Sequence, residues 1–273
     1  MSRVRFVLKQ APALRVDLRG VTPAALAGLT LAQIERLPVT HGMQTVPLAE
    51  FFSVACDDLP EAGSELVFEG DLSRFDRIGW QLAGGRIVIA GPAGDYVGAC
   101  MTGGDVQVQG NAGLLAACEM AGGTLTIAGN VGDHAASTLP GSMDGMRGGT
   151  LIVRGNAGDR FADRMRRGTV LVFGNVGDFL ASRLVAGTIA IGGQAGAHVG
   201  YGMRRGSVVF AGPAPVLPPT FVPALVDAAV AWQLIARDIA RHGGPFAGLS
   251  ARRTARHLGD LAADGRGELI VTV

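Results

Sequence analysis

Cysteine, aromatic side chains and net charge are all scarce in this sequence of 273 residues. The three cysteines, Cys56, Cys100 and Cys118, are an odd number without CxxC spacing, which indicates buried reduced thiols rather than a disulfide framework, a metal site or a redox site. A net charge of +1 gives no basis for binding nucleic acid or a membrane surface. No signal peptide or long uncharged apolar run is seen, which predicts a cytoplasmic protein.

Glycine, in contrast, is abundant, with 42 residues. The glycines recur in register with aliphatic residues, so they indicate ordered turns rather than disorder. Because only 5% of the residues are aromatic, the core is expected to be narrow and filled by Val, Ile, Ala and Met.

The stretch from Arg86 to Gly206 consists of six related units. The sixth residue of each unit is glycine, and these glycines follow one another at steps of 19, 19, 26, 19 and 19 residues: Gly91, Gly110, Gly129, Gly155, Gly174 and Gly193. The long step is a 19-residue unit with seven extra residues, which fall between His134 and Asp144. A fixed period of this size is typical of a solenoid, in which each unit buries its apolar face only against its neighbours.

Each unit opens with a short strand. The second and fourth residues are always aliphatic, as in Ile87 and Ile89, whereas the third is mixed. A turn follows, often Gly-Asn, and then three more inward positions: the eighth, which is small, the twelfth and the sixteenth. The sixteenth residues are Met101, Met120, Met146, Met165, Leu184 and Met203. This pattern predicts an all-β fold, a right-handed parallel β-helix (solenoid) with coils of about 19 residues.

Other interpretations of the glycine-rich turns fail on physical grounds. A dinucleotide-binding fingerprint needs a helix of about ten residues after the turn, and no unit has room for one. A Walker loop needs Gly-Lys-Ser/Thr, whereas Lys9 lies far from any glycine-rich loop. A left-handed helix of hexapeptide repeats would show a sub-period of six residues, and the units show none.

The repeat divides the chain into three parts. We expect an N-terminal capping segment over residues 1–64, the parallel β-helix over 65–212, and a C-terminal α-helix and tail over 213–273. An open end of a solenoid exposes unpaired backbone and core, so a cap is needed there.

The N-terminal segment carries its own signals. Val4, Phe6 and Leu8 alternate with charged residues, as in a half-buried strand. Thr30-Leu-Ala-Gln33 has the spacing of a capping box at the start of a short helix. The aromatic pair at 51–52 is available to cover the end of the solenoid, and residues 66–70 match a first, degenerate coil.

The C-terminal segment changes period. Four prolines between 213 and 219 are expected to end strand pairing. From Phe221 to His242 apolar residues lie on one helical stripe, which Gly243-Gly244-Pro245 ends: Leu225, Ala229, Trp232, Ile235 or Ala236, and Ile239. The last residues, Glu268 to Val273, are strand-like.

No catalytic constellation is apparent, and we predict no catalytic residue and no metal ligand. The histidines that share a unit position, His134 and His198, have no Cys or His partner at metal-binding spacing. The tenth residue of four units is aspartate: Asp95, Asp133, Asp159 and Asp178. A metal is conceivable along this column, but carboxylates beside glycine-rich turns more often accept backbone N–H bonds, so a structural role is favoured.

Seven arginines fall late in four successive units: Arg147, Arg164, Arg166, Arg167, Arg183, Arg204 and Arg205. Since neighbouring strands lie about 4.8 Å apart, these side chains should form a ridge of like charge. One hypothesis is that the aspartates or water balance this charge. The other is that the ridge binds an acidic partner surface or a carboxylate-rich ligand, because arginine suits paired carboxylates.

The pattern Gly-x-x-x-Gly-x-x-x-x-x-Met-x-x-Gly resembles the C-terminal β-helix domain of the glutamate synthase large subunit. Nearly the whole chain is similar to the C subunit of formylmethanofuran dehydrogenase and to its bacterial counterpart, the C subunit of the formyltransferase/hydrolase complex. The segments that carry this similarity are Val46-Pro-Leu-Ala-Glu-Phe-Phe, coils such as Gly129-Asn-Val-Gly-Asp133, and the closing Gly259-Asp-Leu-Ala-Ala-Asp-Gly-Arg-Gly-Glu268.

This resemblance implies a noncatalytic scaffold subunit of a cytoplasmic complex in one-carbon metabolism, of the tetrahydromethanopterin and methanofuran type found in methylotrophy. The A, B and D sister subunits would carry the active sites that convert the formyl group to formate. The complex would use a methanofuran-type cofactor with a glutamate-rich tail. One alternative is that the seven arginines bind this polyglutamyl tail. Another is that the chain is a subunit of a molybdenum or tungsten formylmethanofuran dehydrogenase, although nothing here indicates a pterin site. An activity of the chain itself is the least favoured hypothesis.

Overall fold

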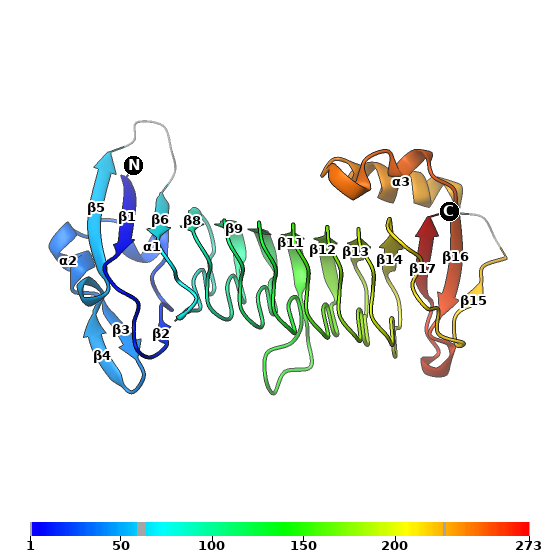
Figure 1. Ribbon diagram of the computed structural model, residues 1–273, viewed down its shortest axis with the longest axis horizontal. Coiled ribbons are helices and arrows are strands. Elements are labelled where there is room, and N and C mark those ends of the chain that lie inside the picture. The colour runs from blue at the N-terminus through cyan, green and yellow to red at the C-terminus, as the bar shows by residue number, and fades with distance from the viewer. Residues whose placement is uncertain (1, 59–63, 226–227, 273) are drawn as a thin grey trace.

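A large sheet runs the length of the molecule (Figure 1). The structure is a computed structural model that describes residues 2–58, 64–225 and 228–272. Its main sheet has 13 strands in the order β15-β16-β17-β14-β13-β12-β11-β10-β9-β8-β6-β1-β5, and a second sheet has four, in the order β4-β3-β2-β7. The expectation of a mostly β protein is therefore confirmed.

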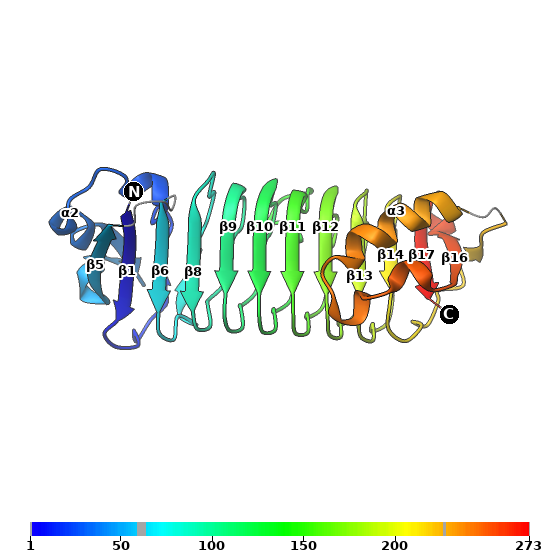
Figure 2. The ribbon, with the colours of Figure 1, turned by 90° about the horizontal axis from the view of Figure 1, so that it is seen from above.

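The strands of the repeat lie side by side in chain order, and all are parallel (Figure 2). They are β6 (Glu65–Glu69), β8 (Arg86–Ala90), β9 (Thr102–Val108), β10 (Gly122–Ile127), β11 (Arg147–Val153), β12 (Arg167–Val172), β13 (Thr188–Ile191) and β14 (Ser207–Phe210). The register follows the sequence repeat, so that Ile87 pairs with Val106, and Leu125 with Leu151. The second and fourth residues of every unit are buried, as their period-two pattern predicts.

A second line of pairing runs through the eighth residues. Isolated parallel bridges join Leu72, Ala93, Ala112, Val131, Ala157, Val176 and Ala195 in turn. The twelfth and sixteenth residues, such as Val97 and Met101, are also fully buried. The core is therefore a continuous column between the sheet and these bridges, and each unit contributes the same inward positions.

The N-terminal segment lies on one end of the sheet. β1 (Ser2–Leu8) pairs with β6 on one side and with β5 (Phe52–Asp58) on the other. The second sheet consists of β2 (Val16–Asp17), β3 (Pro38–His41), β4 (Gln44–Pro47) and β7 (Phe75–Asp76), and the short helices are α1 (Pro23–Leu26), α2 (Leu31–Glu35) and η1 (Leu48–Glu50). The capping box of Thr30 and Gln33 is confirmed at the start of α2. Phe51 and Phe52 are buried against other rings, including Phe75, as expected.

The C-terminal segment differs from the prediction in two ways. Its elements are β15 (Val222–Pro223), α3 (Ala229–Ala240), η2 (Gly244–Phe246), η3 (Leu249–Ala251), β16 (Thr254–Gly259), η4 (Leu261–Ala263) and β17 (Gly267–Thr272). The prediction of a helix from Phe221 was wrong, because residues 222–223 pair with β16 and Leu225 is fully exposed. Residues 226 and 227 of that predicted helix lie outside the described residues, as does Val273 of the final strand.

The second difference is that strand pairing does not end at the prolines. β17 pairs with β14 in parallel, with Ser207 opposite Glu268 and Phe210 opposite Val271. The chain leaves the sheet, forms α3 and returns to add the next parallel strand.

Helix α3 lies across the outer face of the sheet, over its C-terminal half (Figure 2). Its buried residues, Trp232, Ala236 and Ile239, pack in one cluster with outward residues of the strands: Ile152, Leu171, Ala190, Val209 and Ile270. Among the described helices, none is long and apolar enough to cross a membrane.

Candidate functional site

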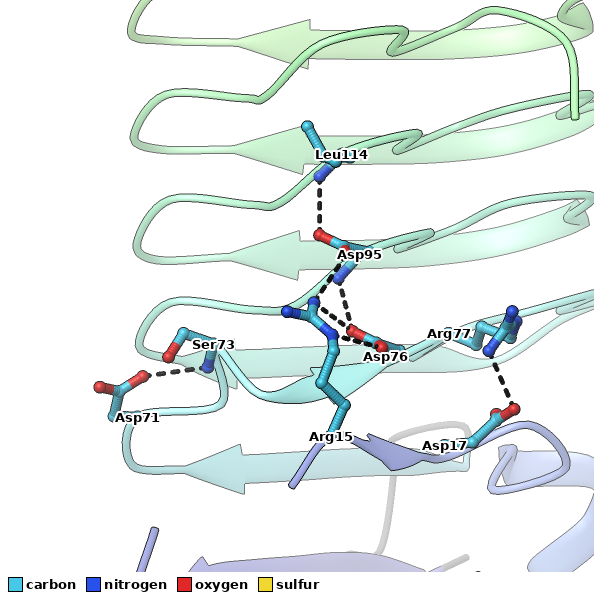
Figure 3. Close-up of polar contacts among 8 residues, drawn as sticks. All are labelled: Arg15, Asp17, Asp71, Ser73, Asp76, Arg77, Asp95 and Leu114. Carbon is cyan, nitrogen blue, oxygen red and sulfur yellow. Dashed lines mark hydrogen bonds and ion pairs between the residues drawn. The ribbon is translucent and has the colours of Figure 1, made fainter. Parts of the chain in front are cut away.

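The aspartate column has the structural role predicted for it. Asp133 accepts a hydrogen bond from the backbone N–H of Asp159 at 2.8 Å, and Asp159 accepts one from Asp178 at 2.8 Å. Asp95 likewise accepts from Leu114 at 2.9 Å (Figure 3). A parallel ladder uses asparagine at the seventh position, where each side-chain carbonyl accepts from the next unit: Asn111, Asn130, Asn156 and Asn175. The acidic column thus connects neighbouring units through the backbone.

The N-terminal segment is fastened to this column by an arginine (Figure 3). Arg15 donates to both oxygens of Asp76, at 2.7 and 2.6 Å, and lies 2.8 Å from a carboxylate oxygen of Asp95. The hydrogen bond to Asp76 raises the pKa of Arg15, against the opposing effect of burial. Beside it, Asp17 accepts from Arg77 at 3.0 Å. This end of the column is therefore occupied by cations from the chain itself.

Burial disfavours the thiolate form of two of the cysteines. Burial raises the pKa of Cys118 and of Cys100, so both are held as thiols at neutral pH. All three cysteines lie in the described part of the chain, and none is in a disulfide. Cys118 is buried as predicted, but Cys100 is only half-buried and Cys56 is exposed, because β5 lies at the edge of the sheet. No group of three or more potential metal ligands occurs among the described residues.

Four of the seven predicted arginines have acidic partners inside the chain. Arg183 makes a two-pronged contact with the buried carboxylate of Asp163, at 3.1 and 2.9 Å. Arg164 lies 4.0 Å from the same residue. Arg147 pairs with Glu119 at 3.4 Å, and Arg166 with Asp144 at 2.6 Å. The charges of these four arginines are therefore balanced by acidic residues that do not belong to the aspartate column: Asp163, Glu119 and Asp144.

The other three predicted arginines, Arg167, Arg204 and Arg205, are exposed. Within residues 2–58, 64–225 and 228–272, no carboxylate pairs with any of them. Arg167 lies opposite Arg147 in the register of β11 and β12, so two cations are neighbours there. Like charges at this spacing repel, and the repulsion is relieved when an anion lies between them.

One member of this group was missed by the sequence analysis. The backbone N–H of Arg266 donates to the carbonyl of Arg204 at 2.7 Å. Arg266, which directly precedes β17, therefore continues the row of arginines by one more strand. Its side chain is exposed and has no acidic partner in the described part of the chain. Aligning Glu268-Leu-Ile-Val with Ser207-Val-Val-Phe would have found it, because this places Arg266 at the position of Arg205.

The arginines line three adjoining hollows, which we call the arginine groove. A hollow of about 580 Å³ lies between Arg164, Arg166, Arg183 and Arg204, with Met143 and Asp264 at its rim. A second, of about 970 Å³, is lined by Arg204, Arg205 and Arg266, by the carboxylates of Asp264 and Glu268, and by Ala231 and Ile235 of α3. The third, of about 370 Å³, is lined by Arg147, Arg166, Arg167 and Arg205, with Asp144. The structure thus brings all seven predicted residues to one surface, together with the carboxylates of Asp144, Asp264 and Glu268.

Comparison with known proteins gives matches at two levels of coverage. A chain in the crystal structure of the formyltransferase/hydrolase complex (FhcABCD) from Methylorubrum extorquens, determined in complex with methylofuran, matches with a TM-score of 0.89 and 37% identity. That match covers 98% of this chain and 99% of the other. No protein-family model matches.

Curated relatives match over shorter segments. The C subunit of the tungsten-containing formylmethanofuran dehydrogenase 2 of Methanothermobacter wolfeii is 33% identical over 101 residues, which is 36% of this chain and 37% of that protein. The C subunit of the formyltransferase/hydrolase complex of Methylorubrum extorquens is 40% identical over 80 residues, 29% of each protein. These alignments span little more than a third of the relatives' length at most.

The similarity by sequence and the end-to-end structural match agree with each other and with the repeat of the sequence. The chain belongs to the family formed by the C subunits of formylmethanofuran dehydrogenases and of the formyltransferase/hydrolase complex.

Proposed function

We propose that this chain is a noncatalytic scaffold subunit of a formyltransferase/hydrolase complex, in which the A, B and D sister subunits convert the formyl group to formate. The observation that carries this proposal is the end-to-end match to a chain of such a complex, at 37% identity over 98% of this chain. The predicted cytoplasmic location belongs to the same proposal.

The architecture supports a scaffold role. We propose that the repeat winds as a right-handed parallel β-helix over residues 65–212, capped by residues 1–64 and closed by residues 213–273. The parallel strands in chain order and the second line of bridges support this winding. A rod with two side-chain ladders presents fixed surfaces, because side-chain hydrogen bonds join successive units from Asp76 to Ala197.

Reconstitution tests the scaffold. Sister subunits of the complex would be purified with and without this chain, and formyl transfer, formyl hydrolysis and particle mass would be measured. We expect assembly and coupled activity to fall at least about tenfold without it. Unchanged assembly and activity would refute the scaffold.

A second candidate function is binding of the polyglutamyl tail of a methanofuran-type cofactor in the arginine groove. The supporting observation is the group of four arginines without acidic partners in the described part of the chain: Arg167, Arg204, Arg205 and Arg266. The matching crystal structure was determined in complex with methylofuran, which is consistent with a cofactor of this type in the complex.

Charge reversal distinguishes this function from the scaffold. Arg204→Glu with Arg266→Glu should weaken binding of a synthetic hexaglutamate at least about tenfold and lower its dependence on salt. Arg241→Glu is the matched control, because Arg241 is an exposed arginine of the α3 end that pairs with Asp238 and lies outside the groove. Equal affinity in the double variant would count against tail binding and leave the scaffold untouched.

The remaining alternative is a subunit of a molybdenum or tungsten formylmethanofuran dehydrogenase. The end-to-end structural match to a chain of the hydrolytic complex favours the first proposal, as does its higher identity by sequence, 40% over 80 residues against 33% over 101. Metal analysis of the copurified native complex tests it: molybdenum or tungsten in stoichiometric amount would establish the dehydrogenase alternative.

A further inference from the structure

A ladder of stacked side chains occupies the eleventh position of three successive units, where Arg160 and Phe179 are half-buried and His198 is exposed. The guanidinium carbon of Arg160 lies 4.8 Å from the ring centre of Phe179. The ring of Phe179 stacks on His198 with centroids 4.7 Å apart and planes inclined by 22°. Tyr201 meets the same phenylalanine edge-on at 6.3 Å and is itself 60% exposed.

The backbone at this position does not favour large side chains. The eleventh residue of every unit has a left-handed conformation, with φ of 60° at Phe179 and 59° at His198. Glycine or asparagine adopts this conformation at the least cost, whereas a bulky residue is strained. Large side chains nonetheless occupy this position in all six units, and those of Arg160, Phe179 and His198 stack on one another.

The tenth residue of three successive units, directly before His134, Arg160 and Phe179, adds charge. Asp133, Asp159 and Asp178 are exposed, and each uses one carboxylate oxygen to accept a backbone N–H. None of the three has an ion-pair partner in the parts of the chain that the structure describes. The asparagine ladder shows that a neutral amide makes the same hydrogen bond equally well, at 2.8 Å. The negative charges are therefore not needed for the ladder, and at a spacing of about 4.8 Å they repel one another.

The same column shows which group complements it. At its N-terminal end, Arg15 from a segment remote in sequence occupies Asp76 and Asp95 together (Figure 3). A guanidinium thus fits between the carboxylates of successive units. The carboxylates farther along the column, those of Asp133, Asp159 and Asp178, have no such partner among the described residues.

We propose that one surface, which we call the stacked edge, is the docking surface for a basic segment of a partner subunit. It consists of Asp159, Asp178, Phe179, His198 and Tyr201. Arginine or lysine side chains of that segment meet Asp159 and Asp178, and an apolar side chain packs against Tyr201 and His198. Tyrosine is enriched among interface hot spots, and the carboxylates beside it provide charge complementary to a basic segment. This inference rests on the proposed scaffold function, and it assigns the stacked edge to a basic partner, in contrast to the arginine groove.

The test uses the complex reconstituted with its sister subunits. Asp159→Asn with Asp178→Asn removes the charge and keeps the acceptor oxygen, so the ladder is retained. We expect this variant to associate about tenfold more weakly than wild type and with a smaller dependence on salt. Tyr201→Ala should weaken association at least about tenfold. Asp238→Asn on α3 is the matched control and should leave the affinity unchanged, since that residue lies on an unrelated surface.

Each outcome decides one point. Wild-type affinity and salt dependence in both variants, with their thermal unfolding unchanged, would overturn the proposal. So would a self-associating isolated chain that becomes monomeric in the double variant, because a second copy would then be the occupant. A wild-type chain that fails to assemble with the sister subunits would instead sink the scaffold function itself.

Discussion

The outer face of the repeat has two halves with the same strand geometry. The half formed by β8 to β10 is open, whereas the half formed by β11 to β14 is covered by other parts of the chain. On β8, β9 and β10 the third residues of the units are Val88, Gln107 and Thr126, which are partly exposed. On β11 to β14 they are apolar and buried in one cluster with residues of α3 and of the turns that follow it: Ile152, Leu171, Ala190 and Val209.

This difference separates the positions that the core of the repeat requires to be apolar from the position that becomes apolar only where another part of the chain packs on the sheet. The inward second and fourth residues are aliphatic in both halves, because every unit must fill the same core. The third residue is free to be polar until a helix packs on it. A variable column within a regular repeat therefore locates the part of the surface that another element covers.

A charge placed in this buried cluster should have the largest effect. Leu171→Asp would bury an unpaired carboxylate and should lower the free energy of unfolding by more than about 3 kcal/mol. Thr126→Asp, at the matching position of the open half, should cost less than about 1 kcal/mol. Urea denaturation of both variants measures the difference, and similar losses would show that the two halves are not distinct.

The helix side of the contact should be nearly as sensitive. Trp232 is 6% exposed, and Trp232→Ala should cost about 3 kcal/mol through the cavity it leaves. Val230 lies on the outer face of the same helix and is 77% exposed, so Val230→Ala should change stability by less than about 0.5 kcal/mol. Thermal unfolding compares the two, and an equal cost would mean that α3 does not depend on its packing against the sheet.

At the C-terminal end of the covered half, the stability that Asp260 contributes to the fold should be lost in acid. Burial acts to raise the pKa of this carboxyl, but hydrogen bonds from Thr220, Gly202 and Ala262 outweigh it and leave the pKa below the usual 3.8. Since the folded pKa is the lower one, the carboxylate contributes stability above about pH 4, and this is lost as the pH falls further.

Asp260→Asn should therefore cost about 1–2 kcal/mol at pH 7 and much less at pH 3. Denaturation curves at the two pH values measure this. A penalty that is the same at both would show that the charge of Asp260 does not hold the closing turn to the last unit.

The smallest change in stability is expected when polar residues on the open half of the sheet face are replaced by apolar ones. Gln107→Leu with Thr126→Ile should alter the free energy of unfolding by less than about 0.5 kcal/mol, because both side chains face outward. The variant should self-associate with rising concentration, since it extends an exposed apolar patch. Sedimentation velocity detects this, with Gln107→Asn as the polar control. A monomeric variant would show that the polar residues are not needed to keep this face open.

Much of the fold could be predicted because its signals are local. The period of 19 residues, the aliphatic pair of Ile87 and Ile89, and the capping box at Thr30 each follow from residues close in the chain. The start of α3 could not, because Val222 pairs with Leu258, which is far away in sequence. The exposed Cys56 was missed for a related reason, since an edge strand looks like a buried one until its neighbours are known.

The candidate site likewise has a part that local sequence patterns predict and a part that they do not. The sequence by itself determined that seven arginines share late positions in successive units, because a fixed repeat stacks equal positions above one another. Only the tertiary structure decided which of them keep an unpaired charge and that Arg266 joins them. Those outcomes depend on Asp144, which projects from an inserted loop, and on β17, which returns to the sheet after α3, and no local pattern specifies such long-range contacts.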